Sequence, residues 1–140
     1  MRIISGKLKG KSILFLKSSI TRPLKDSVRE NIFNILSHSN LFDVTIKKSN
    51  VLDLYSGIGS FGLECISRGA NQITFVEKNE SIIKILNKNL LNLSIQNKAI
   101  VVKDKILNFL NKKSNNKFEI IFFDPPFAEN NYIEELKLIY

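Results

Sequence analysis

The chain has 140 residues, of which 44% are hydrophobic, 9% aromatic and 24% charged. This size and composition indicate one globular domain that is long enough to bury a hydrophobic core. No uninterrupted apolar stretch approaches the roughly 20 residues of a membrane-spanning helix, and the amino terminus lacks the apolar segment of a secretory signal, so we expect a cytoplasmic protein.

The net charge of +8 is unevenly distributed. Residues 1–48 contain ten Lys or Arg and three Asp or Glu, a net charge of +7, whereas residues 49–140 have a net charge of +1. Such concentrated positive charge predicts contact with a polyanion such as nucleic acid. AT-biased coding would also enrich lysine, but it does not account for the segregation. We therefore expect a basic amino-terminal appendage over 1–48 and a core domain over 49–140.

The predicted elements alternate between strand and helix after a short amino-terminal region. In chain order we expect strands over 2–4 and 11–16, a loop at 21–23, a helix that begins with the capping box Ser27–Glu30, a strand over 51–54, a helix over 60–68, a strand over 72–76, a helix over 81–91, a strand over 100–102, a helix over 105–110, a strand over 118–123 and a helix over 133–139. This order predicts an α/β fold, a doubly wound and mostly parallel sheet with a small β-hairpin and helix in front.

Cysteine and histidine usage argues against disulfides and metal sites. Cys65 is the sole cysteine and falls on an amphipathic helical pattern, so we expect an inert core thiol in a reducing compartment. His38 is the sole histidine and has no Cys or His near it in sequence, so no metal site is expected.

A glycine-rich turn follows the strand over 51–54. Gly57, Gly59 and Gly62 have the spacing of the dinucleotide fingerprint, which is weak evidence by itself. Asp53 lies beside this turn, where a carboxylate would oppose a pyrophosphate at the helix amino terminus but would favour a ligand with an ammonium group. S-adenosylmethionine has an ammonium group, a sulfonium group and no phosphate, so we expect this ligand and not a nicotinamide cofactor.

Acidic residues end the next three strands as well. Glu77 stands where doubly wound folds bind ribose hydroxyls, and Asp104 ends the third strand, where it could accept the adenine amine. Asp124 follows the fourth strand. Each acid alone could be a solvated strand end. Together they predict one crevice at the carboxyl edge of the sheet.

The tetrad Asp124-Pro125-Pro126-Phe127 directly follows the apolar run 120–123. Neither proline has an N–H group, so the local backbone offers carbonyl acceptors without competing donors. A carboxylate, these carbonyls and an aromatic face are suited to a flat ring that carries an amine. A strand end followed by a polar turn is the alternative interpretation.

The chain resembles class I S-adenosylmethionine-dependent methyltransferases and closely resembles the RsmD family, which methylates the exocyclic N2 of a guanine in bacterial 16S ribosomal RNA. The resemblance rests on residues 1–11, 21–34, 51–64 and 124–127. Two positions depart from the family pattern, because Leu24 replaces a threonine and Ser27 replaces an arginine. The chain also ends thirteen residues after Phe127, so we expect it to lack the last three of the class's seven strands, as a truncated frame or a fragment would, and to expose the strand over 118–123 as an edge.

This resemblance implies the roles of individual residues. It places the target base at the tetrad, the cofactor at Asp53, Tyr55, Gly57, Gly59, Glu77 and Asp104, and RNA phosphates at Arg2, Lys7, Lys9, Lys11, Arg22 and Arg29. The implied partner is 16S ribosomal RNA or the assembling small ribosomal subunit. DNA adenine-N6 and protein glutamine-N5 methyltransferases remain alternatives, as does a catalytically inactive remnant that binds RNA. A nicotinamide-dependent oxidoreductase is supported by the glycine spacing only. The oligomeric state is left open.

Overall fold

The centre of the protein is a four-stranded parallel sheet, described by a computed structural model that covers residues 1–16, 24–38 and 43–140. Its strands are β1 (Asn50–Leu54), β2 (Gln72–Glu77), β3 (Ala99–Lys103) and β4 (Ile120–Phe123), in the spatial order β3-β2-β1-β4. The chain builds outward from β1 to β3 and then crosses back to place β4 on the other side of β1. This order confirms the predicted doubly wound α/β sheet, and the crevice of such a sheet lies where the order reverses, between β1 and β4.

The helices follow the predicted order. They are α1 (Asp26–His38), α2 (Ser60–Ser67), α3 (Glu80–Asn92), α4 (Ile106–Asn111) and α5 (Tyr132–Ile139), with a short 3₁₀ helix η1 (Gln96–Lys98) before β3. Helix α1 begins at Asp26, one residue before the predicted capping box, so Ser27 lies inside the first turn. Within the described ranges, no helix is long and apolar enough to cross a membrane.

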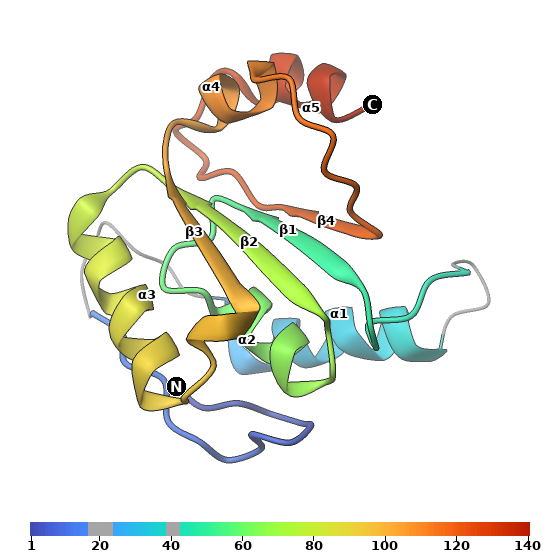
Figure 1. Ribbon diagram of the computed structural model, residues 1–140, viewed down its shortest axis with the longest axis vertical. Helices are drawn as coiled ribbons and strands as arrows, with labels where there is room; N and C mark the ends of the chain where they lie inside the picture. Colours follow the sequence, from blue (N-terminus) through green and yellow to red (C-terminus); the bar gives the residue numbers. More distant parts are fainter. Residues whose placement is uncertain (17–23, 39–42) are drawn as a thin grey trace.

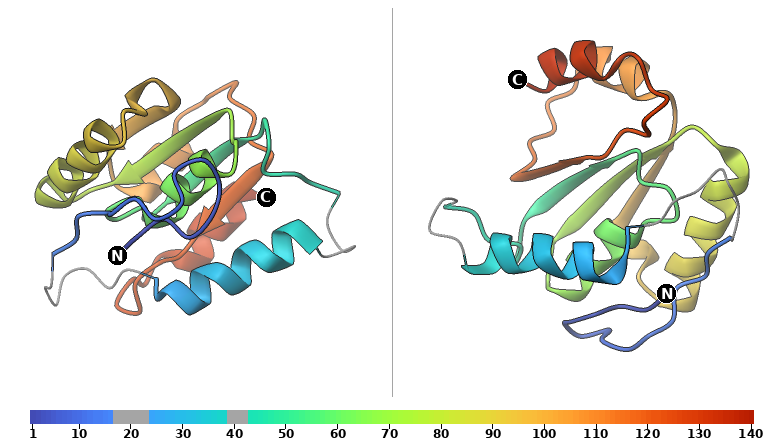
Figure 2. Two further views of the ribbon diagram at one scale, coloured as in Figure 1. Left: turned by 90° about the horizontal axis from the view of Figure 1, so that it is seen from below. Right: turned by 180° about the vertical axis from the view of Figure 1, so that it is seen from behind.

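Helices cover both faces of the sheet, as Figure 1 shows. α1, α2 and α3 lie on one face and α4 and α5 on the other, and the two rotated views in Figure 2 agree. Successive residues of a strand point to opposite faces. Val51 therefore belongs to the large core cluster beneath α1–α3, whereas Leu52 and Leu54 belong to a smaller cluster that includes Ile106 of α4. β4 is an edge strand, paired with β1 alone among the described strands, and its Ile121 is exposed.

The amino-terminal segment 1–16 differs from the predicted pair of strands. Its ladder is reduced to one isolated antiparallel bridge between Arg2 and Ser12. The segment is nevertheless part of the core, because Ile3 and Ile13 are buried in the same cluster as the residues of α1, α2 and α3. It lies along the side of the molecule opposite α4 and α5 (Figure 1).

Polar side chains of α2 and α3 hold this segment in place. The buried Glu64 carboxylate accepts the backbone N–H groups of Ile4 and Ser5, both at 2.9 Å. The buried Asn89 side chain accepts the N–H of Leu14 at 2.7 Å and donates to the carbonyl of the same residue at 3.1 Å. These bonds satisfy backbone groups that a regular strand pair would have paired.

The buried face of α1 takes in only some of the apolar residues of this helix, with Ile32 and Leu36 partly buried against the core. Val28 and Ile35 are exposed, whereas Phe33 is buried and stacks on Phe61 of α2 with ring centroids 5.1 Å apart. Cys65 of α2 is buried and free, which confirms the predicted core thiol, and burial raises the pKa of that thiol.

Candidate functional site

A cavity of about 880 Å³ opens at the carboxyl ends of the strands. Three of the four predicted strand-end acids line it, namely Asp53, Glu77 and Asp124. Parallel strands end at the same edge of a sheet, and the strand order places β1 between β2 and β4, so the three acids converge. The volume lies within the range of small-molecule and cofactor sites, which is about 300–1,000 Å³.

Asp53 is the most deeply buried of these acids. Its Oδ2 atom accepts the backbone N–H of Gly62 in α2 at 3.1 Å. The pKa of Asp53 is raised to about 8, chiefly by burial and to a smaller extent by the nearby Asp124 and Glu77, against the opposing effect of the Gly62 hydrogen bond. In the ligand-free protein Asp53 is therefore largely uncharged at pH 7. The negative charge predicted from the sequence develops on this residue only above that pKa or beside a cationic group.

Glu77 joins the two turns that border the cavity. Its Oε2 atom accepts the N–H of Gly57 at 3.1 Å, and its Oε1 atom accepts the N–H of Asn79 at 2.8 Å. Gly57 has a φ of 56° and Gly59 a φ of 87°, the left-handed region that favours glycine. A Cβ at residue 59 would also lie 2.4 Å from the Leu86 side chain. Gly57 lines the cavity, whereas Gly59 does not, and its left-handed backbone shapes the turn next to the cavity.

Two further residues of the first turn face the cavity. Tyr55 lines it and has a φ of 59°, which is uncommon for a residue other than glycine. Ser56 lines it as well, and its buried hydroxyl has no hydrogen-bond partner among the described residues. A buried hydroxyl without a partner is costly unless a ligand or water supplies one, so this atom supports a polar ligand in the cavity.

The structure does not bring Asp104 into this group. Its side chain is not part of the cavity wall, and it binds Lys112 Nζ at 2.6 Å and the backbone N–H of Lys105 at 2.8 Å. The hydrogen bond from Lys112 lowers the pKa of Asp104. In this arrangement the carboxylate accepts a backbone N–H at the start of α4. Its proposed contact with adenine remains a prediction.

The tetrad forms the opposite wall of the cavity. All four of its residues line the cavity, and both prolines follow trans peptide bonds. Asp124 lies at the rim with much of its surface exposed, and partial desolvation raises its pKa. Phe127 is fully exposed, so its ring is available to a ligand. The segment then turns, with the Glu129 N–H bonded to the Pro126 carbonyl at 2.8 Å.

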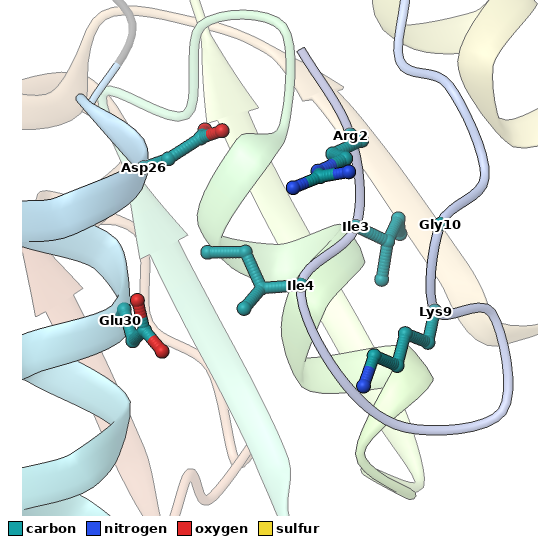
Figure 3. Close-up of a pocket in the computed structure, with 7 residues that line it drawn as sticks. All are labelled: Arg2, Ile3, Ile4, Lys9, Gly10, Asp26 and Glu30. Atoms are coloured by element: carbon teal, nitrogen blue, oxygen red, sulfur yellow. The ribbon is translucent and has the colours of Figure 1, made fainter.

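The residues predicted to contact RNA have different environments. Arg2, Lys7, Lys9 and Lys11 are exposed on segment 1–16. A hollow of about 180 Å³ lies between segment 1–16 and α1, and it is lined by Arg2 and Lys9 of the segment and by Asp26 and Glu30 of α1, which Figure 3 draws as sticks. Arg22 lies outside the described residues.

Arg29 is a correction to the predicted phosphate contacts. Its side chain is fully buried and its NH2 atom donates to Asp26 at 3.0 Å and to the backbone carbonyl of Arg2. Burial lowers the pKa of Arg29. In this position Arg29 anchors segment 1–16 to α1, and it has no exposed surface with which to contact a phosphate.

The sequence interpretation missed several residues of the cavity wall. Ser56 and Lys78 line the cavity and directly follow the predicted site residues Tyr55 and Glu77 in the chain. Their position next to these residues could have predicted them. Lys25 and Val28, at the start of α1, also line the cavity. The helical spacing of apolar residues did not show that Val28 faces the cavity and not the core. Among the described residues, no group of three or more His, Cys, Asp or Glu side chains is placed to hold a metal ion.

A parallel sheet with a glycine turn after β1, and a cavity where the strand order reverses, define a Rossmann-like fold, and two solved structures that are 32% identical to this chain place it among the methyltransferases. A solved structure described as a putative methyltransferase yhhF from Escherichia coli superposes with a TM-score of 0.84 at 32% identity, over 99% of this chain and 71% of that one. A family profile described as Conserved hypothetical protein 95 matches residues 1–139.

Curated relatives are similar over the whole chain. The Ribosomal RNA small subunit methyltransferase D of Buchnera aphidicola subsp. Baizongia pistaciae is 36% identical over 100% of this chain and 74% of its own length. The protein of the same name from Haemophilus influenzae is 34% identical over 100% of this chain and 77% of its own length. The chain belongs to the RsmD family of methyltransferases, and it spans about three quarters of these two relatives.

Proposed function

We propose that this protein transfers a methyl group from S-adenosylmethionine to the exocyclic N2 amine of a guanine in 16S ribosomal RNA. The observation that carries the proposal is the single cavity with Asp53 and Glu77 in one wall and the complete tetrad Asp124–Phe127 in the other. Cofactor and target base need adjoining sites for a direct transfer, and this cavity supplies both. The names of the similar proteins support ribosomal RNA as the substrate.

The wall formed by β1 and β2 fits the cofactor. Glu77 is suited to the ribose hydroxyls, the role of an acid at this strand end in doubly wound folds. Asp53 is suited to a cationic ligand, because a positive charge nearby favours the ionised form of a buried carboxyl group. The unpartnered Ser56 hydroxyl and the backbone at Tyr55 and Gly57 border the same space. When bound, S-adenosylmethionine supplies a methyl group on a positively charged sulfur.

The tetrad holds the target base. The Asp124 carboxylate and the Pro125 carbonyl accept the hydrogens of the amine, whose lone pair is otherwise delocalised into the ring, and Phe127 stacks on the base. These bonds favour a more tetrahedral nitrogen, stabilise the positive charge that develops on it, and leave Asp124 or water to take the proton. Positioning and charge stabilisation then provide most of the catalysis. A base stacked in a helix cannot reach this cavity, so the guanine is single-stranded or flipped out.

The exposed cations of segment 1–16 are proposed to contact RNA phosphates. Arg2, Lys7, Lys9 and Lys11 provide affinity without sequence choice, and this contribution weakens as the salt concentration rises. The substrate is free 16S RNA or an assembling small subunit, in a bacterial cytoplasm. The division into a basic part over 1–48 and a core over 49–140 remains part of this proposal, although segment 1–16 shares the main hydrophobic core.

The experiment that tests the function is nucleoside mass spectrometry. The protein is incubated with S-adenosylmethionine and either unmodified 16S RNA or small subunits assembled from it, and the RNA is then digested. We expect N2-methylguanosine, formed about a hundredfold more slowly or worse by the D124A variant. Parallel incubations with DNA and with protein substrates distinguish the alternatives, because N6-methyladenine or N5-methylglutamine in place of N2-methylguanosine would contradict the proposal.

Two outcomes would point to the remaining alternatives. Binding of RNA and S-adenosylmethionine without transfer to any substrate would identify a catalytically inactive remnant. Binding of NADH in a fluorescence titration, without binding of S-adenosylmethionine, would identify a nicotinamide site. Asp53 opposes the second outcome, since a pyrophosphate at the amino terminus of α2 would lie beside its buried carboxyl group.

A further inference from the structure

A partly buried hydrogen bond links α5 to the turn after β1. The Tyr55 hydroxyl lies 2.8 Å and 2.7 Å from the two carboxylate oxygens of Glu135, to which it donates. Glu135 is 2% exposed, although its neighbour Glu134 in the same helix is exposed. A carboxylate acceptor makes a stronger hydrogen bond than a neutral one, and this bond joins residues 80 positions apart in the chain.

Tyr55 needs such a bond because its backbone is unusual. A φ of 59° is disfavoured for a large side chain and persists where surrounding contacts impose it. The Tyr55 ring also packs edge-on against Phe123, the residue before the tetrad, with centroids 5.8 Å apart. The hydroxyl contact and the ring contact together hold this residue from the side of β4 and α5.

The residues directly after Tyr55 form the cavity wall. Ser56 donates its N–H to the Val76 carbonyl at 3.1 Å, and Gly57 donates to Glu77 at 3.1 Å. The unpartnered Ser56 hydroxyl projects from the same short turn. Any change in the Tyr55 backbone would therefore move groups that border the proposed cofactor.

A second contact follows the same pattern. Glu129, two residues after the tetrad, pairs with Lys78 at 3.7 Å, and Lys78 lines the cavity beside Glu77. The Glu129 side chain is mostly buried and Lys78 is exposed, so this pair is weaker than the Tyr55 bond. Both acids lie after the tetrad in the chain, and both contact residues of the opposite wall.

We propose that Glu135 is a positioning residue, whose carboxylate holds Tyr55 and thereby sets the shape of the cofactor-binding turn at Ser56 and Gly57. The consequence for cofactor affinity rests on the proposed function, whereas the effect on the turn does not. This bond couples the position of the segment that carries the base-binding tetrad to the position of the turn that binds the cofactor.

Amide hydrogen exchange in the ligand-free protein tests the positioning directly. In E135A we expect the Ser56 and Gly57 amides to exchange about fivefold faster or more, while the Ser81 amide at the start of α3 is unchanged. E135Q retains an acceptor for the hydroxyl and should restore slow exchange. E134A removes an exposed carboxylate from the same turn of α5 and is the matched control, with wild-type exchange expected.

The Y55F variant separates positioning from general loss of stability. It keeps the aromatic ring and removes the hydroxyl, so it should accelerate exchange at Ser56 and Gly57 as E135A does. Equal acceleration at Ser81 in E135A and Y55F would show that the contact only stabilises the fold, and would overturn the proposal. Unchanged exchange at Ser56 and Gly57 in both variants would overturn it as well.

Titration calorimetry with S-adenosylmethionine then tests the consequence. We expect E135A and Y55F to bind about fivefold more weakly or worse, and E135Q and E134A to bind within about twofold of the wild type. The double variant Y55F/E135A should bind S-adenosylmethionine with the same affinity as the weaker-binding of the two single variants, because both substitutions remove the same hydrogen bond.

Equal affinity for S-adenosylmethionine in the wild type and E135A would overturn the proposal and leave the proposed function intact. A wild type that binds no S-adenosylmethionine would overturn the function, and the exchange result would still decide the role of Glu135.

Discussion

In the wall of the cavity formed by β1 and β2, Asp53 is buried and accepts the Gly62 N–H, and Glu77 accepts two backbone N–H groups. In the opposite wall, Asp124 and Phe127 are exposed after the edge strand β4. The first wall is therefore part of the folded core, and its carboxyl groups have structural partners. The second wall keeps its functional groups free for a substrate. Substitutions in the first wall should change ligand affinity and stability together, whereas those in the second should change the reaction alone.

The largest expected effect concerns Asp124. We expect D124A to lower the rate of methyl transfer about a hundredfold or more, because the charge that develops on the amine loses its stabilising group. Affinity for S-adenosylmethionine, measured by calorimetry, should stay within about twofold of the wild type, because Asp124 is exposed at the rim. Equal losses of transfer and cofactor binding would place Asp124 in the cofactor site and remove the difference between the walls.

The next effect concerns Glu77. We expect E77A to weaken S-adenosylmethionine binding about tenfold or more, because the cavity loses a charged acceptor and the Gly57 and Asn79 amides lose theirs. E80A removes an exposed carboxylate three residues further on and serves as the matched control, with unchanged affinity expected. Calorimetry that shows equal affinity for E77A and the wild type would remove Glu77 from the site.

Stability should distinguish Gly62, which supports the first wall through its hydrogen bond to Asp53, from the exposed residues of the second wall. A Cβ at residue 62 would lie 2.3 Å from the buried Phe75 ring, so G62A should lower the free energy of unfolding by about 1–3 kcal/mol. F127A removes a fully exposed ring and should change that free energy by less than about 0.5 kcal/mol. Urea unfolding followed by circular dichroism measures both. A large loss of stability in F127A would show that the tetrad wall is part of the core after all.

The smallest effect concerns pH and Asp53. Its pKa of about 8 means that this group holds a proton at pH 7, and a cationic ligand favours the ionised form. S-adenosylmethionine binding should therefore release up to about one proton at pH 7, and affinity should rise between pH 6 and 7.5. Calorimetry in buffers of different ionisation enthalpy measures the release. D53N should abolish the release and the pH dependence, and a release that persists in D53N would assign it to another group.

The stability of the ligand-free protein should depend on Asp53 in the opposite direction. The folded state holds this proton up to about pH 8, whereas the ordinary pKa is 3.8, so the folded state binds more protons in that window. The contribution of Asp53 to the free energy of unfolding therefore falls as pH rises from about 4 to about 8. Less steep pH dependence in D53N than in the wild type, measured by thermal unfolding, would confirm it.

Much of the fold and part of the site followed from local patterns. Every strand and helix predicted from residue 27 onward is present, with ends that differ by no more than two residues. The apolar runs and the glycine turn determine these elements, and parallel strands necessarily end at one edge. That geometric rule brought Asp53, Glu77 and Asp124 together correctly.

The same rule could not say which way each side chain points or which partner it finds. Asp104 also ends a strand, but Lys112 lies near enough to pair with it. Arg29 is of a residue type usually found at the surface, yet it is buried, and its NH2 group donates to Asp26 and to the Arg2 carbonyl. Glu135 carries no motif at all, and only the position of α5 reveals its contact with Tyr55.

The sequence by itself determined the order of strands and helices, the parallel doubly wound sheet, and the strand-end acids and tetrad that converge on its carboxyl edge. These features depend on neighbours within a few residues and on the geometry common to parallel sheets. Tertiary structure alone decided which charges are buried, which face of α1 is covered, and how Glu64, Asn89 and Glu135 secure distant segments. Those bonds join residues about 60 to 80 positions apart. No local pattern encodes them, because they exist only once the packed elements bring the two partners together.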